Sequence, residues 1–190
     1  MAPHQQLIYD QSVQIPAILR NKLNELDEAA MLLLQKSKRF GKTYIVTNAA
    51  EGWVELSAKR FLPLVFDELQ RDVVVISART RYEKLFPRNY QRWKVEAFME
   101  TRKDMDSQAM TNLIALGDNI FEIEAAYILG AQFKNAFIKT VKFRQSPSTN
   151  ELIKQLKLVE QQFELICNSA KNLTVRLLRQ EGEGQQEKPK

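Results

Sequence analysis

Two short runs, residues 72–77 and 112–118, constrain the fold most, because they are apolar almost without interruption. The first reads DVVVIS and the second NLIALGD. A strand with one face in water alternates polar and apolar residues, whereas a strand covered on both faces does not. Residues 42–47, KTYIVT, and residues 136–143, AFIKTVKF, add two further strands. The chain therefore needs helices on both faces of a sheet.

Segments with helical periodicity separate these strands. Apolar residues recur at steps of three and four along them, which is typical of a helix with one buried face. We expect helices over residues 16–41, from residue 52 with a kink or an end at Pro63, over 93–105, over 121–129, and from residue 148 after a capping box. Strands alternating with helices predict an α/β fold with a Rossmann-like, mostly parallel sheet. The two lysines of residues 136–143 suit an edge strand.

The length and the composition suit one compact domain. The chain has 190 residues, of which 44% are hydrophobic, and we expect the domain to cover residues 16–179 after an N-terminal segment of residues 1–15. Residues 180–190 have nothing to bury, which predicts a disordered tail. No run of apolar residues is long enough for a transmembrane helix, and the N-terminus lacks a signal-peptide pattern. We expect a cytoplasmic protein without a membrane partner.

Two residue counts exclude more chemistry than the charge does. The chain has one histidine, His4, and one cysteine, Cys167. With His4 so near the N-terminus, the sequence lacks the residues needed for a Ser-His-Asp triad, a Cys-His pair or a zinc site of His and Cys ligands. The catalytic chemistry that remains uses carboxylates, lysine, hydroxyl groups and hard cations such as magnesium. The net charge of +5 comes from scattered basic residues, so the sequence gives no clear indication of a nucleic-acid partner.

Polar residues follow three of the expected strands, and ligands bind at the carboxyl ends of the strands in parallel sheets. Thr47 follows the first, Ser77 and Arg79 lie at the end of the second, and Asp118 follows the third. Each also has an ordinary structural interpretation. Arg79 can form an ion pair, and Asp118 can cap the next helix.

Four longer strings carry a family resemblance. IVTNAAEGWVELSAKRFLP, VISARTRYEKLFP, RWKVEAF and ALGDNIFE occur in this order. Together they resemble the haloacid dehalogenase-like (HAD) superfamily, and within it a group of uncharacterised HAD-like proteins of protists and algae. The resemblance covers about residues 14–178. It implies a HAD-like fold and phosphatase-type chemistry with Mg²⁺ on a phosphorylated small molecule or protein.

The resemblance also assigns roles to particular residues. It places Thr47 and Asn48 at a phosphate. Lys94 would neutralise the nucleophile and the phosphate. Asp118 would bind magnesium, with Glu122 as a second ligand.

The covalent nucleophile of this family has no clear match. Its members carry an Asp-x-Asp motif at the end of a first, central strand, and no such motif precedes Thr47. The nearest substitute is Asp10, but Ser12 stands where the second aspartate is needed. Only five residues separate Asp10 from Pro16, too few for the turn and hairpin that follow the nucleophile.

Three arrangements of the first strand stay open. Residues 5–10 could replace it, the two flanking strands could pair directly, or the chain could be a truncated product. Three functions follow. The first is a HAD-like pseudoenzyme that retains phosphate or magnesium binding. The second is an active magnesium-dependent phosphohydrolase that uses Asp10. The third is a non-catalytic module that docks on a protein partner through the helix after Pro16.

Overall fold

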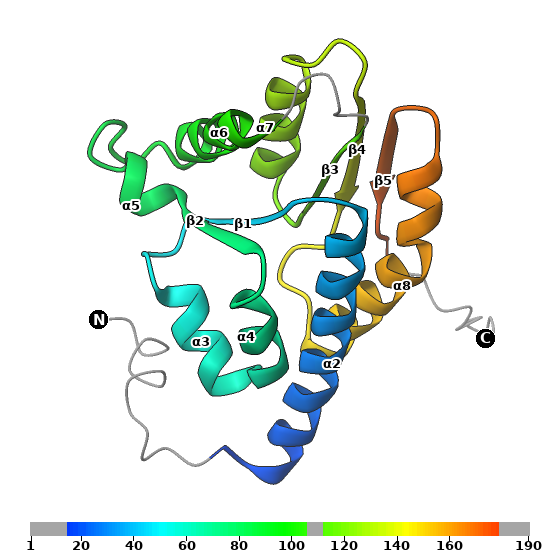
Figure 1. The fold of residues 1–190 in the computed structure, drawn as a ribbon. Coiled ribbons are helices and arrows are strands. Elements are labelled where there is room, and N and C mark those ends of the chain that lie inside the picture. Colours follow the sequence, from blue (N-terminus) through cyan, green and yellow to red (C-terminus); the bar gives the residue numbers. More distant parts are fainter. Residues whose placement is uncertain (1–14, 106–111, 179–190) are drawn as a thin grey trace, which may run out of the picture.

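A computed structural model describes residues 15–105 and 112–178 of the chain. Helices and strands alternate along these residues, and Figure 1 shows the helices packed around the strands. In chain order the elements are α2 (Ala17–Phe40), β1 (Thr43–Thr47), α3 (Trp53–Phe61), α4 (Pro63–Leu69), β2 (Val73–Ser77), α5 (Ala78–Tyr82), α6 (Tyr90–Thr101), the short 3₁₀ helix η1 (Arg102–Asp104), β3 (Asn112–Gly117), α7 (Ile120–Gly130), β4 (Phe137–Lys142), α8 (Thr149–Asn168) and β5 (Leu173–Arg176).

The strands form two parallel sheets rather than one. β1 pairs with β2, with Thr43 opposite Val73. β3, β4 and β5 form the second sheet in that order. The expected α/β fold with parallel strands is therefore confirmed. β1 and β3 do not pair within the described ranges, so direct pairing of the two flanking strands is wrong.

The prediction that residues 136–143 form an edge strand is also wrong. β4 lies between β3 and β5, and its Lys139 is completely buried. The Lys139 ammonium donates a hydrogen bond of 2.6 Å to the Cys167 carbonyl at the end of α8, and burial lowers the pKa of this lysine. The sequence prediction missed β5 because its four residues alternate between half-buried and exposed, unlike the continuous apolar runs of the other strands.

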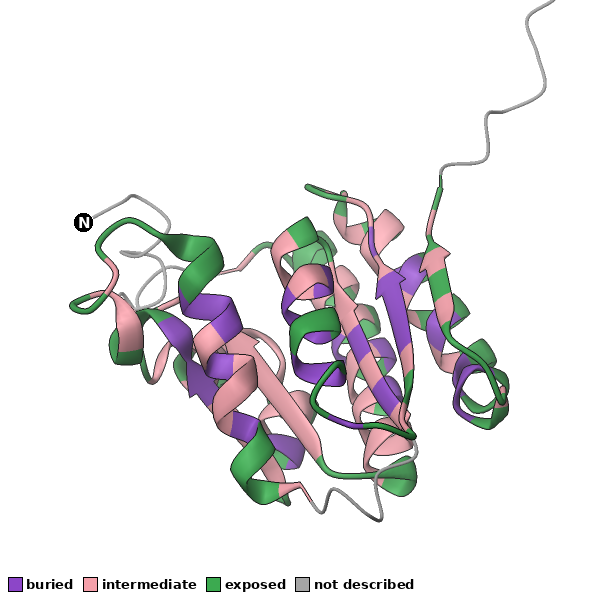
Figure 2. Ribbon diagram, turned by 90° about the horizontal axis from the view of Figure 1, so that it is seen from above, coloured by how far each residue is buried: buried purple, intermediate pink, exposed green. Residues whose placement is uncertain are grey.

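Helices cover both faces of the β3–β4–β5 sheet. Leu113 and Ala115 of β3 pack in one cluster with side chains of α6 and α7. Ile114 and Leu116, which point to the opposite face, pack on a cluster built from α2, β4 and α8. Figure 2 shows the buried residues gathered where helices face strands, with exposed residues on the outward turns.

α2 begins after Pro16 and ends before Gly41, as the sequence predicts. It packs against α4, and the buried Asp27 carboxylate accepts hydrogen bonds of 2.9 Å from the backbone N–H groups of Leu64 and Val65. The Asp27 carboxylate thus accepts hydrogen bonds from backbone N–H groups in the first turn of α4. The N-cap residue of α4 itself makes no side-chain hydrogen bond to these groups. Pro63 therefore separates α3 from α4, as expected.

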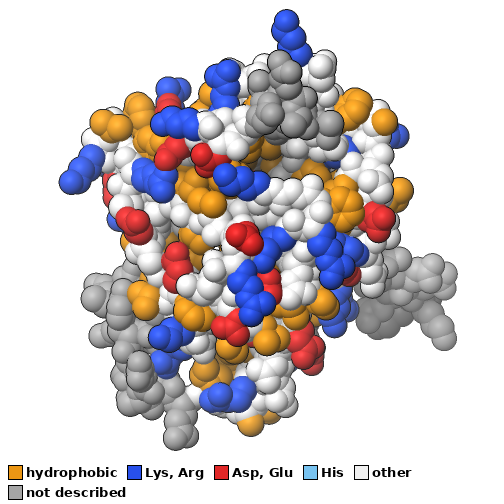
Figure 3. Space-filling model, viewed as in Figure 1, with side chains coloured by type: hydrophobic (Ala, Val, Ile, Leu, Met, Phe, Trp, Pro, Cys, Tyr) orange, Lys and Arg blue, Asp and Glu red, His pale blue; other side chains and the backbone are white. Residues whose placement is uncertain are grey.

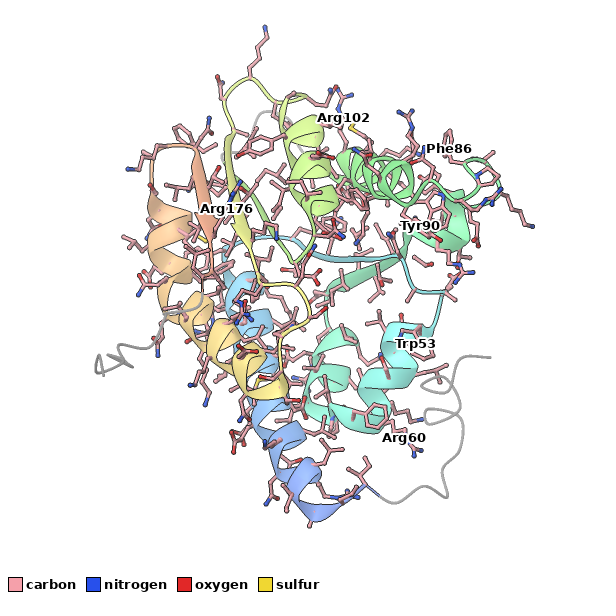
Figure 4. All side chains as sticks on the ribbon, turned by 180° about the vertical axis from the view of Figure 1, so that it is seen from behind. Trp53, Arg60, Phe86, Tyr90, Arg102 and Arg176 are labelled. Carbon is pink, nitrogen blue, oxygen red and sulfur yellow. The ribbon has the colours of Figure 1, made fainter. Side chains whose placement is uncertain are left out.

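α6 begins three residues earlier than predicted, at Tyr90, because Asn89 caps it by accepting from Arg92 N–H. Trp93 is completely buried and donates to the Phe86 carbonyl. The Tyr90 ring packs edge-on against Trp93, with ring centroids 4.7 Å apart, and Figure 4 shows Tyr90 and Phe86 together at this turn. Trp93 is thus a packing residue that fixes the start of α6.

Candidate functional site

Lys94 connects the carboxyl end of β1 to the start of α7. Its side chain is 7% exposed, and its ammonium lies 3.0 Å from Glu122 Oε1. The same ammonium donates a hydrogen bond of 2.5 Å to the carbonyl of Val46, the residue before Thr47. Two residues that the family resemblance assigns to one site, Lys94 and Glu122, are therefore in contact beside Thr47.

Glu122 is held by a second contact. Its Oε2 accepts from Asn119 N–H at 3.1 Å, and the Asn119 side chain accepts from Phe121 N–H, which completes a capping box. A Cβ at Gly117 would lie 2.7 Å from the Glu122 Cβ, so only glycine allows β3 and α7 to approach this closely. Because Asn119 is the N-cap of α7, the interpretation of Asp118 as that cap is wrong.

Asp118 directly follows β3, at the same edge of the sheet. Its side chain is exposed and has no hydrogen bond or ion pair with any residue in the described ranges. Its backbone carbonyl accepts from the Lys142 ammonium at 3.1 Å. Lys142 ends β4, so it brings a second cation to this edge, which the sequence analysis did not single out.

Thr47 and Asn48 begin a tightly held loop. Thr47 Oγ1 accepts from Ala49 N–H at 3.0 Å, and Ser77, at the end of β2, donates to the Ala49 carbonyl at 2.7 Å. Thr80 then accepts from Glu51 N–H at 3.0 Å. The ends of β1 and β2 are thus tied together, and the buried Asn48 Oδ1 has no hydrogen-bond partner in the part of the chain described.

Arg79 does not join this site. Its guanidinium forms an ion pair of 3.0 Å with Glu83, one turn along α5. This contact raises the pKa of Arg79 and matches the structural interpretation of that residue.

The described residues fit magnesium only in part. Glu122 has a protein partner on each carboxylate oxygen, so the free carboxylate at this edge belongs to Asp118. Residues 15–105 and 112–178 contain no group of three or more His, Cys, Asp or Glu side chains that could hold a metal ion. Asp10, the expected nucleophile substitute, lies outside the described residues.

Basic and acidic side chains are intermixed on the face of the molecule seen in Figure 3. Among the helices of the described ranges, none combines the length and the apolar character needed to cross a membrane. No family model, curated protein or solved structure matches the chain.

Proposed function

We propose that this chain is a HAD-like, phosphatase-type domain that binds a phosphate group without hydrolysing it. The ligand would be a phosphorylated small molecule or a phosphorylated protein. The observation that carries the proposal is the position of the buried Lys94 ammonium, 2.5 Å from the Val46 carbonyl and therefore directly beside Thr47. A cation held in place by the fold needs no rearrangement when it meets an anion.

The hydrogen-bond donors at this edge support anion binding. A lysine ammonium has three donors, and Lys94 uses two of them on Val46 and Glu122. The third remains for a phosphate oxygen. Thr47 uses its oxygen as an acceptor for Ala49 N–H, which leaves its O–H group as a donor. Lys142 adds positive charge from the end of β4.

The residues within 15–105 and 112–178 do not favour a covalent step. A nucleophilic carboxylate must reach the phosphorus atom that Lys94 and Thr47 would hold. Glu122 is engaged by Lys94 and by the start of α7, and the exposed Asp118 side chain has no partner in the described ranges that would hold it in place for attack. We therefore propose a pseudoenzyme, with an active phosphohydrolase that uses Asp10 as the alternative.

Phosphate binding is tested by thermal unfolding of the full chain with and without inorganic phosphate. A ligand that binds the folded state alone raises the Tm. We expect the rise to be lost in Thr47→Val and kept in Thr43→Val, a matched control at the opposite end of β1. No rise in the wild type, or an equal rise in Thr47→Val, would refute the proposal and favour the interaction module.

Hydrolysis is tested with p-nitrophenyl phosphate and Mg²⁺. We expect no turnover above background, since removal of a covalent nucleophile costs several powers of ten in kcat. Turnover that is abolished by Asp10→Asn would instead establish the active phosphohydrolase.

A further inference from the structure

Two neighbouring cations lie at the carboxyl edge of the β3–β4–β5 sheet. Lys142 ends β4 and Arg176 ends β5, and the two residues stand opposite each other in the parallel register. Residues in register on neighbouring parallel strands point to the same face of the sheet. Figure 4 shows Arg176 on β5, beside β4. The two side chains therefore leave this edge of the sheet side by side.

Neither cation forms an ion pair within the part of the chain that the structure describes. The Lys142 ammonium donates to two backbone carbonyls there, that of Asp118 at 3.1 Å and that of Phe143 at 3.5 Å. The Arg176 side chain is exposed and has no hydrogen-bond partner among the same residues. A lysine ammonium has three donors and a guanidinium has five. Both groups therefore keep donors for an anion.

A continuous series of contacts joins these cations to the Lys94 site. The peptide group between Asp118 and Asn119 lies in the middle. Its N–H donates to Glu122 Oε2 at 3.1 Å, and its carbonyl accepts from the Lys142 ammonium at 3.1 Å. The other oxygen of Glu122 lies 3.0 Å from the Lys94 ammonium. Along this path the two ammonium groups are at most about 14 Å apart.

This edge has more positive charge than its carboxylates neutralise. Glu122 pairs with Lys94, which leaves the exposed carboxylate of Asp118 beside the two cations. That carboxylate forms an ion pair with neither of them. Ligands of parallel sheets bind at the carboxyl ends of the strands. The excess charge thus lies where a ligand is expected, next to the site that Lys94 and Thr47 form.

We propose that the ligand is a small molecule with two anionic groups, and that Lys142 and Arg176 bind the second group. The first group is the phosphate at Thr47 and Lys94, so this inference rests on the proposed function. The second group is a phosphate or a carboxylate, because ammonium and guanidinium groups bind both. A gap of at most about 14 Å between the ammonium groups suits a single small molecule.

The two cations have different roles in this subsite. The Lys142 ammonium is held by two carbonyls, so its position is fixed before the ligand arrives and little order is lost on binding. Arg176 presents a planar fork of donors that can meet two oxygens of one phosphate or carboxylate at once. Arg176 is therefore the residue that favours ligands with a second anionic group.

The test is isothermal titration calorimetry of the full chain with three ligands built on the same six-carbon chain. Hexyl phosphate has one anionic group, 6-(phosphonooxy)hexanoate adds a carboxylate at the far end, and hexane-1,6-diyl bisphosphate adds a second phosphate. All titrations use the same ionic strength, because salt screens exposed charges. We expect one or both of the ligands with two anionic groups to bind about tenfold or more tightly than hexyl phosphate. The tighter of the two identifies the second group. Equal affinities of all three ligands overturn the inference.

A pair of variants locates the second group. Arg176→Gln should reduce the preference for two anionic groups by about fivefold or more, with the affinity for hexyl phosphate unchanged. Arg176→Lys should keep part of the preference, since lysine keeps the charge without the fork. The matched control is Lys171→Gln, at an exposed lysine just before the opposite end of β5. Equal losses in Arg176→Gln and Lys171→Gln would indicate general attraction of anions and overturn the assignment.

Failure of this inference and failure of the proposed function give different results. If the phosphate site is absent, inorganic phosphate does not raise the Tm and hexyl phosphate does not bind. If the second group alone is wrong, inorganic phosphate still raises the Tm and Thr47→Val still abolishes the rise. The three six-carbon ligands then bind with equal affinity.

Discussion

Replacement of Lys94 by methionine should destabilise the protein much more than replacement of a paired lysine that is less buried. Methionine fills a similar volume but removes the charge and the donors. The Val46 carbonyl would lose a charge-assisted hydrogen bond. The Glu122 carboxylate would lose its ion-pair partner, although the Glu122 side chain is only 15% exposed to water.

The magnitude follows from these two losses. A hydrogen bond to a charged group contributes about 1.5–3 kcal/mol, and breaking a buried pair by removing one partner costs about 3–5 kcal/mol. Because Glu122 is partly exposed and keeps its bond to Asn119 N–H, we expect the low end, about 3 kcal/mol for the whole substitution. For a chain of this size, that lowers the Tm by about 6–12 °C.

The matched control is Lys36→Met. Lys36 forms an ion pair of 2.6 Å with Glu160, but both side chains are about a quarter exposed, at 23% and 25%, so we expect a loss of at most about 1 kcal/mol. Urea unfolding of the single variants, of Glu122→Gln and of the double variant Lys94→Met with Glu122→Gln gives a double-mutant cycle. The double variant should recover about 1–2 kcal/mol relative to Lys94→Met. Equal losses in Lys94→Met and Lys36→Met, or additive losses in the cycle, would refute the reasoning.

Two further predictions concern the helix starts. Hydrogen bonds from Ser148 and the Arg144 guanidinium lower the pKa of Glu151 from 4.5 to about 2, so the carboxylate stabilises the folded chain above pH 4.5 and this contribution is lost as the pH falls toward 2. Glu151→Gln should therefore be less stable than the wild type at pH 7. In urea unfolding, the difference in unfolding free energy between the two proteins should shrink as the pH falls from 4.5 toward 2. A difference that is independent of pH would contradict the assignment. Asn119→Ala should cost about 1 kcal/mol of stability by loss of the α7 cap. Asp118→Ala should leave the Tm unchanged, because its carboxylate is exposed and has no partner in the described ranges. A larger fall in Tm for Asp118→Ala than for Asn119→Ala would show that the cap is misassigned.

Part of the candidate site is predictable from the sequence. The strand ends at Thr47 and Asp118 were predictable, because apolar runs followed by polar residues mark the carboxyl edge of a parallel sheet. The resemblance assigns Lys94 and Glu122 to one site, but their contact is visible only in the structure, since nothing in the sequence spacing brings those two residues together. Lys142 is not among the predicted site residues, because lysines in a strand favour an exposed edge, whereas β4 lies inside its sheet and brings Lys142 to the Asp118 carbonyl.

The sequence by itself determined the type and order of the longer helices and of the first four strands, but not the short α5, η1 and β5. The predicted elements depend on local periodicity, on proline and glycine positions and on caps such as Ser148 with Glu151. Tertiary structure alone decided the strand order, the burial of Lys139 and the separation of β1 from β3. These features depend on backbone hydrogen bonds between segments far apart in the chain. Such bonds are the same for every residue type, so the sequence of side chains does not reveal which edges remain open.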